Sequence, residues 1–292
     1  MYKEIAANKR KTIYIIVGFI VFITAISAIF AYFFGDWSIM IWSLIAVVGY
    51  TVLQYFISSS TAIAMSGARK VTKKEAPRLY NVVENLAITT GLPMPKVYIV
   101  DDPAPNAFAT GRDPKHACVA ATTGLLDIMD DNELTGVMAH EMSHVKNYDI
   151  RVSTIVYGLV SVVGLLTDIS FRLLFYGNRR RDEERSPVGL IIMLITAILA
   201  PLFAWLAQLA ISRQREYLAD ASAVNITRYP EGMINALKKL QTHSQPLKSQ
   251  NTAMAQMYIN NPLRKSFLGG LFSTHPPIEK RIERLEHGKN SF

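Results

Sequence analysis

Two long apolar runs near the start of the chain limit the folds that it can adopt. The runs Ile13–Phe34 and Ile39–Ser58 contain no charged residue. Each is close to the about 20 residues that a helix needs to cross the hydrocarbon core of a bilayer. We therefore predict two membrane-spanning helices, joined by a short turn at Gly35-Asp36. The first run is too long, and too quickly followed by the second, to be a cleaved signal peptide.

The basic residues predict how this hairpin is oriented. The turn between the runs has no lysine or arginine. The basic residues flank the two runs instead: Lys3, Lys9, Arg10 and Lys11 before the first, and Arg69, Lys70, Lys73 and Lys74 after the second. Positive-inside bias places the N-terminus and the region after residue 60 in the cytoplasm. We interpret the net charge of +8 as a consequence of this topology and of attraction to anionic lipid. The sequence shows no stripe of basic residues interleaved with aromatic residues, so it does not indicate a nucleic-acid partner.

Two further apolar runs, Ile155–Gly177 and Val188–Ile211, predict a second hydrophobic hairpin. Together the four runs explain why charged residues are only 18% of the chain, where about 25% is usual in soluble domains. The third run contains Asp168 and Arg172, which can pair on one helix face. The connector between the runs is rich in arginine, against the positive-inside trend if both runs cross. The pair therefore either spans the membrane or forms a shallow re-entrant hairpin.

The segment His140-Glu141-Met142-Ser143-His144 carries the clearest chemical pattern. Residues four apart lie on one helix face, so two imidazoles can bind one metal ion while Glu141 reaches a water on that ion. Asp130 and Glu133 form a helix-start signature just before it. The pattern predicts a zinc peptidase site. The alternative is an exposed helix with two solvated histidines.

Catalytic zinc takes three protein ligands and leaves one position for water. The extended pattern with a third histidine is excluded, because Asn147 and Ile150 occupy the positions that it requires. We predict that Glu216 on a second helix is the third ligand. Asp220, four residues further on the same face, is then placed to accept the N–H of a ligating histidine. The alternative is that both are ordinary surface acids beside neighbouring arginines.

The remaining regions predict an α+β fold that is mostly helical. Residues 75–90 have helical periodicity, and three strands are expected at Lys96–Val100, Phe108–Thr110 and Cys118–Thr122. Cys118 is the single cysteine, so it forms no internal disulfide and is expected to be a small core residue. Four regions follow: a transmembrane hairpin at 1–60, a first half-domain at 61–152, the second hairpin at 153–211 and a second half-domain at 212–292.

Taken in order, these features resemble the HtpX family of membrane-embedded zinc metallopeptidases, which are related to the CAAX prenyl proteases. The resemblance covers the two pairs of apolar runs, His140–His144, the Glu216/Asp220 helix, and Thr274-His275-Pro276-Pro277 with Arg281-Ile282. It implies a gluzincin-like peptidase domain fused to transmembrane helices, with one zinc ion per chain. It also implies a bacterial plasma-membrane endopeptidase with a cytoplasmic active site. Its expected substrates are misfolded or damaged membrane proteins, and the sequence leaves its oligomeric state open.

Within this framework Glu141 is expected to act as general base. His275 is a candidate donor to the oxyanion, or alternatively an inhibitory zinc ligand or a histidine held in a proline-rich turn. Asn106-Ala107-Phe108 resembles the edge strand along which related peptidases bind substrate, and the alternative is a plain turn. Three other functions stay open: a processing peptidase for a narrow substrate class, a non-proteolytic membrane chaperone, and a transporter with a structural zinc.

Overall fold

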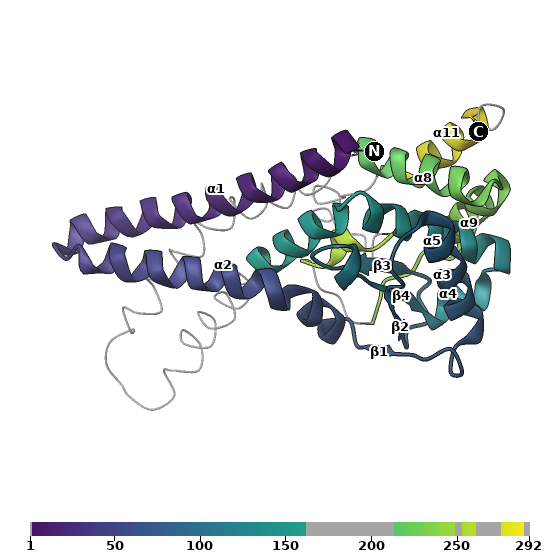
Figure 1. Ribbon diagram of the computed structural model, residues 1–292, viewed down its shortest axis with the longest axis horizontal. Coiled ribbons are helices and arrows are strands. Elements are labelled where there is room, and N and C mark those ends of the chain that lie inside the picture. The colour runs from purple at the N-terminus through teal and green to yellow at the C-terminus, as the bar shows by residue number, and fades with distance from the viewer. Residues whose placement is uncertain (1, 162–212, 249–252, 261–275, 289–292) are drawn as a thin grey trace.

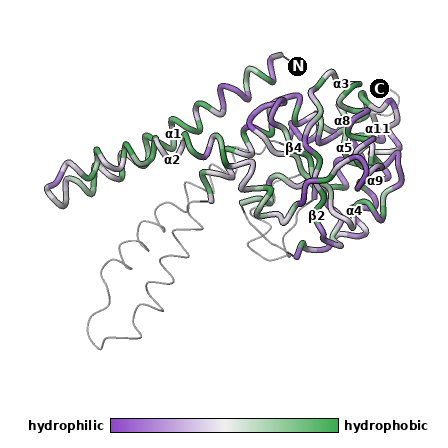
Figure 2. Tube along the Cα trace, turned by 60° about the horizontal axis from the view of Figure 1, so that its bottom comes forward, coloured by the Kyte–Doolittle hydropathy of each residue, from purple (hydrophilic) through white to green (hydrophobic). Residues whose placement is uncertain are grey.

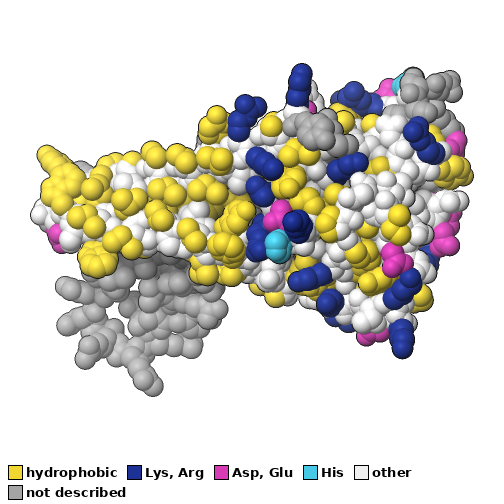
Figure 3. Space-filling model, viewed as in Figure 1, with side chains coloured by type: hydrophobic (Ala, Val, Ile, Leu, Met, Phe, Trp, Pro, Cys, Tyr) yellow, Lys and Arg dark blue, Asp and Glu magenta, His cyan; other side chains and the backbone are white. Residues whose placement is uncertain are grey.

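The computed structural model describes residues 2–161, 213–248, 253–260 and 276–288. Helices α1 (Tyr2–Phe34) and α2 (Ser38–Met65) form a long hairpin that extends away from the part of the structure that holds the sheet (Figures 1 and 2). Gly35 makes the turn with a φ of 68°, a conformation that glycine adopts without steric cost. Both helices are long and apolar enough to cross a membrane. Their surface is largely apolar in the space-filling view (Figure 3), as the sequence predicts.

A four-stranded sheet forms the centre of the compact part. The strands are β1 (Ala68–Lys70), β2 (Lys96–Val100), β3 (Ala107–Thr110) and β4 (Cys118–Thr122), in the order β1-β2-β4-β3. β2 and β4 are parallel, and the other two pairs are antiparallel. The three predicted strands are confirmed, and β3 starts one residue earlier than expected. β1 was not predicted, because three residues with two exposed basic side chains give no recognisable alternation. β3 lies at the edge of the sheet.

Helices surround this sheet. They are α3 (Pro77–Thr90), α4 (Thr123–Ile128), α5 (Asp131–Lys146), a helical segment at 149–161, α8 (Arg213–Thr227), α9 (Pro230–Thr242) and α11 (Ile278–Gly288), with 3-10 turns η1 (Pro114–His116) and η3 (Ala255–Met257). The predicted cap of α5 is confirmed: Asp130 accepts from the backbone of Glu133, whose side chain accepts in return from the backbone of Asp130. A side chain at Gly136 would meet the backbone N of Met233 at 2.9 Å, so this glycine lets α5 and α9 approach closely.

Both faces of the sheet are covered. One face, with Val97 and Val119, joins the large core formed with α3, α5 and α9. The other face, with Phe108 and Cys118, packs on the end of α2 and on residues of the 247–258 region. Cys118 is buried, as expected of a small core residue, and burial raises the pKa of its thiol. The core therefore holds α5 rigidly against the sheet.

The helical segment 149–161 connects the compact part to the hairpin. Its Val152, Ile155 and Leu159 pack against Phe19 of α1 and Val47 of α2. The hydroxyl of Tyr50 also donates to the carbonyl of Gly158 at 2.7 Å. This packing fixes the hairpin beside the end of α5. The predicted second hairpin, with Asp168 and Arg172, lies outside the described residues apart from its first few positions.

Candidate metal centre

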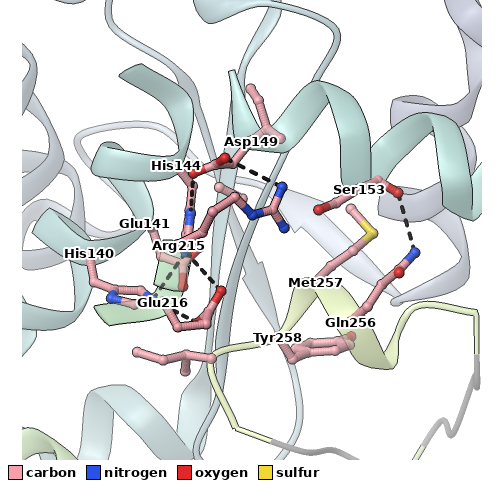
Figure 4. Close-up of a pocket in the computed structure, with 13 residues that line it drawn as sticks. His140, Glu141, His144, Asp149, Ser153, Arg215, Glu216, Gln256, Met257 and Tyr258 are labelled. Atoms are coloured by element: carbon pink, nitrogen blue, oxygen red, sulfur yellow. Dashed lines mark hydrogen bonds and ion pairs between the residues drawn. The ribbon is translucent and has the colours of Figure 1, made fainter. Parts of the chain in front are cut away.

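Three potential metal ligands from two helices converge at one point. His140 and His144 lie one turn apart on α5, and their Nε2 atoms are 3.2 Å apart. The carboxylate of Glu216 on α8 places Oε2 3.7 Å from Nε2 of His140 and Oε1 3.7 Å from Nε2 of His144 (Figure 4). Two nitrogens that bind one tetrahedral zinc at about 2.0–2.1 Å lie about 3.3 Å apart, so the observed spacing suits such an ion. The three side chains therefore fit a metal site.

Burial removes the simpler alternatives for these residues. His140 is 1% exposed and Glu216 is 4% exposed, so His140 is not a solvated surface histidine and Glu216 is not an ordinary surface acid. Asp220 is buried with them, at 2%. Burying a carboxylate is costly unless it is paired or binds a metal. The buried histidine and carboxylate side chains of this site are therefore typical of a site that binds a cation.

Asp220 orients His140 and is itself held by an arginine. Its Oδ1 lies 2.9 Å from Nδ1 of His140, which leaves Nε2 directed at His144 and Glu216. Arg281 of α11 binds the same carboxylate through two hydrogen bonds, of 2.8 Å from Nε and 2.6 Å from Nη2. Arg281 is fully buried. A histidine ligand is usually fixed in this way by a carboxylate behind it.

The charges in this cluster shift the pKa values of its members. Burial alone would raise the pKa of Asp220, but the Arg281 guanidinium outweighs it and lowers the pKa to about 2. Burial would lower the pKa of His140, yet hydrogen bonds to Asp220 and Glu216 raise it to about 9. Asp220 is therefore ionised at neutral pH. His140 must lose a proton before it can bind a metal.

Asp149 orients the ring of His144 in the same way that Asp220 orients the ring of His140. Its Oδ2 lies 3.0 Å from Nδ1 of His144, and its Oδ1 lies 3.5 Å from Nη1 of Arg215 (Figure 4). Burial would raise the pKa of Asp149, but the contact with His144 lowers it. Tyr148, with a φ of 62°, turns the chain between α5 and the segment 149–161. Each predicted histidine ligand thus has its own carboxylate.

Glu141 is 2% exposed and lines the same pocket as His140, His144 and Glu216, which are called the metal group below. Ala109 of β3 forms part of the wall, and residues 256–259 form another part (Figure 4). Glu141 therefore lies beside both the proposed ligands and the edge strand, where a general base for hydrolysis would be needed.

The edge of β3 is partly covered by the chain itself. Ala107 accepts a hydrogen bond of 3.0 Å from the backbone of Ile259, and Phe108 forms a bridge with Tyr258. The side chain of Asn106 donates to the carbonyl of Asn260 at 2.9 Å and accepts from its N–H at 3.2 Å. The three residues predicted to bind substrate thus hold residues 258–260 in this structure. Ala109, two positions after Ala107 and on the same edge, faces the pocket.

The pattern of the sequence predicts the ligand set and Asp220, but it does not indicate other residues that surround them. Asp149 lies past the end of α5, so helical spacing gives no signal for it. Arg281 was noted only as part of a motif. Its contact with Asp220 joins residues 61 positions apart. His275 lies outside the described residues.

Comparisons with known proteins identify the family of the chain. The family model described as Peptidase family M48 matches residues 73–289. The chain is 55% identical over 292 residues to a protein named "Protease HtpX homolog" from Tropheryma whipplei (strain Twist), covering 100% of both. It is 46% identical to one of the same name from Ligilactobacillus salivarius (strain UCC118), covering 98% and 99%. The crystal structure of S. mikatae Ste24p matches with a TM-score of 0.50 at 21% identity, covering 98% of this chain and 67% of that one.

The fold, the metal group and these similarities define a membrane metallopeptidase. The chain belongs to peptidase family M48, among the HtpX homologues that cover its full length.

Proposed function

We propose that the chain is a zinc-dependent endopeptidase of the bacterial plasma membrane that cleaves misfolded or damaged polypeptides, including membrane proteins, on the cytoplasmic side. The observation that carries this proposal is the convergence of His140, His144 and Glu216, with a carboxylate behind each histidine. Neither a chaperone nor a transporter needs an acid such as Glu141 beside this group.

In this proposal His140, His144 and Glu216 hold the zinc. When bound, zinc would polarise the peptide carbonyl and lower the pKa of a water ligand to near 7. Glu141 then accepts the proton of the attacking water and later delivers it to the leaving amine. Asp220 and Asp149 keep both imidazoles in the tautomer that directs Nε2 to the metal. His275 remains our candidate for a further donor to the oxyanion or for an inhibitory ligand.

The substrate is proposed to bind as an extended strand along β3. Ala107 and Ala109 direct their backbone groups to the same edge, because alternate residues of an antiparallel strand do so. Residues 258–260 bind the Asn106–Phe108 end, and Ala109 adjoins the pocket. A substrate backbone would therefore meet β3 at Ala109, beside Glu141. Recognition through backbone hydrogen bonds gives broad sequence selectivity, which suits an enzyme that removes damaged proteins.

Removal of the metal tests this proposal. The full chain in detergent or nanodiscs, treated with a chelator, is expected to stop cleaving both an unfolded soluble polypeptide and a membrane-tethered one. Stoichiometric zinc should restore cleavage, read by the appearance of internal fragments. Cleavage that persists without metal excludes the mechanism. Binding of unfolded chains without fragments from the zinc-loaded protein would instead support a chaperone.

Replacing Asp220 by asparagine is expected to weaken metal retention by about ten- to hundredfold, as changes behind a ligating histidine do. The amide carries no charge to hold the His140 imidazole or to pair with Arg281. Zinc competition against a chromophoric chelator measures the change. Metal retention equal to that of the unchanged protein would contradict the role given to Asp220.

A further inference from the structure

The beginning of α1 touches the end of the helix that carries both histidines. Asn8, which is 5% exposed, donates from its side-chain amide to the carbonyl of Asn147 at 2.9 Å and to Oδ1 of Asp149 at 2.7 Å. An asparagine amide has two N–H donors, and these contacts can use both. The partners are 139 and 141 positions away in the chain.

Asp149 is the carboxylate through which this contact reaches the metal group. Its Oδ2 contacts Nδ1 of His144, and its Oδ1 accepts a hydrogen bond from the Asn8 amide. The same Oδ1 also lies near Arg215, the residue before Glu216. One buried carboxylate therefore joins α1, α5 and α8. A carboxylate held on both sides has one orientation, and it fixes the ring of the histidine that it binds.

The turn that carries Asp149 depends on the same helix. Tyr148 has a φ of 62°, which a bulky residue adopts only where its surroundings impose it. Lys9 of α1 lies 4.6 Å from the centre of the Tyr148 ring, and Arg151 lies 4.9 Å from it. The amide of Asn8 also caps Asn147, whose carbonyl is at the end of α5. Two adjacent residues of α1 thus hold three consecutive residues beyond the metal helix.

We propose that Asn8 is a positioning residue of the metal site: through Asp149 it orients His144, so the first membrane helix is a structural part of the peptidase centre as well as an anchor. The inference rests on the proposed function, because it takes His144 as a metal ligand.

Asn8→Ala and Asn8→Asp test the proposal in the full chain reconstituted in nanodiscs. Alanine removes both donors, and aspartate keeps the shape but sets a second carboxylate against Asp149. Cobalt(II) replaces zinc as a spectroscopic probe, and zinc affinity is measured by competition with a chelator. Ser27→Ala is the matched control, since Ser27 is a buried residue of α1 whose hydroxyl donates to the carbonyl of Ile23 in its own helix.

We expect Asn8→Ala to weaken zinc binding by about ten- to hundredfold and to change the visible cobalt spectrum. Asn8→Asp should weaken binding at least as much, and Ser27→Ala should match the unchanged protein. A variant that lowers the melting temperature but leaves the cobalt spectrum and zinc affinity unchanged would show a purely structural role and overturn the proposal. Wild-type protein that binds cobalt at this site but cleaves nothing would instead refute the proposed function, and leave the role of Asn8 intact.

Discussion

Replacing Glu141 by glutamine is expected to abolish peptide hydrolysis while the metal stays bound. The two side chains have the same shape, but an amide cannot accept the proton of the attacking water. General base catalysis contributes about a hundred- to ten-thousandfold, so turnover should fall by that factor. The three proposed metal ligands are untouched, and zinc content should be unchanged. Fragment formation and zinc content per chain, measured on one preparation, check both parts.

Asp131→Asn is the matched control for this change. It is also an acid-to-amide replacement on α5, but the Asp131 side chain is 81% exposed and pairs with Arg78 at the surface. A surface pair of this kind contributes about 0–1 kcal/mol, so activity should be kept. Normal cleavage by the Glu141 variant would require another base. Loss of zinc from that variant would mean that Glu141 also supports the metal.

Replacing Arg281 by methionine is expected to give the largest loss of stability. Arg281 is 0% exposed and binds Asp220 with two hydrogen bonds, so its removal leaves a buried carboxylate without its main partner. Breaking a buried pair in this way typically costs about 3–5 kcal/mol. The guanidinium also donates to the carbonyl of Ile259 at 3.3 Å, which links α11 to the segment that covers β3. Chemical unfolding in detergent, followed by circular dichroism, measures the free energy of unfolding.

Arg284→Met serves as the comparison, because Arg284 lies on the same helix but is exposed and stacks on Tyr217 at 4.2 Å. An exposed cation–π contact is worth about 0.5–1 kcal/mol, so a small loss is expected. Combining Arg281→Met with Asp220→Asn should lower the free energy of unfolding by less than the sum of the two single losses, because no unpaired Asp220 carboxylate is left buried. If the two losses simply add, the pair does not stabilise the fold in the way described.

The parts of this protein that could be predicted from sequence are those determined locally. The cap at Asp130 and Glu133 and the spacing of His140 and His144 lie within one helix, and helical periodicity makes them readable. Glu216 could be chosen because zinc chemistry requires a third ligand and its helix presents Asp220 one turn later. These choices needed no knowledge of how the elements pack.

The missed residues depend on tertiary structure. Asp149 reaches His144 only because Tyr148 adopts a left-handed turn, which no spacing rule anticipates for tyrosine. Arg281 meets Asp220 across the α8–α11 contact. The pairing of residues 258–260 with β3 joins segments that are 154 positions apart at Asn106 and Asn260. Such contacts follow from the assembled fold and leave no periodic pattern in the chain.

The long-range contacts around the two histidines also bear on when the metal site forms. Asn8 and Asp149 are separated by 141 positions, and Arg281 and His140 by the same number. Loop closure over such distances comes late, after local helices have formed. A newly synthesised chain should therefore lack a complete metal site until its assembly is nearly finished, and stay catalytically silent until then.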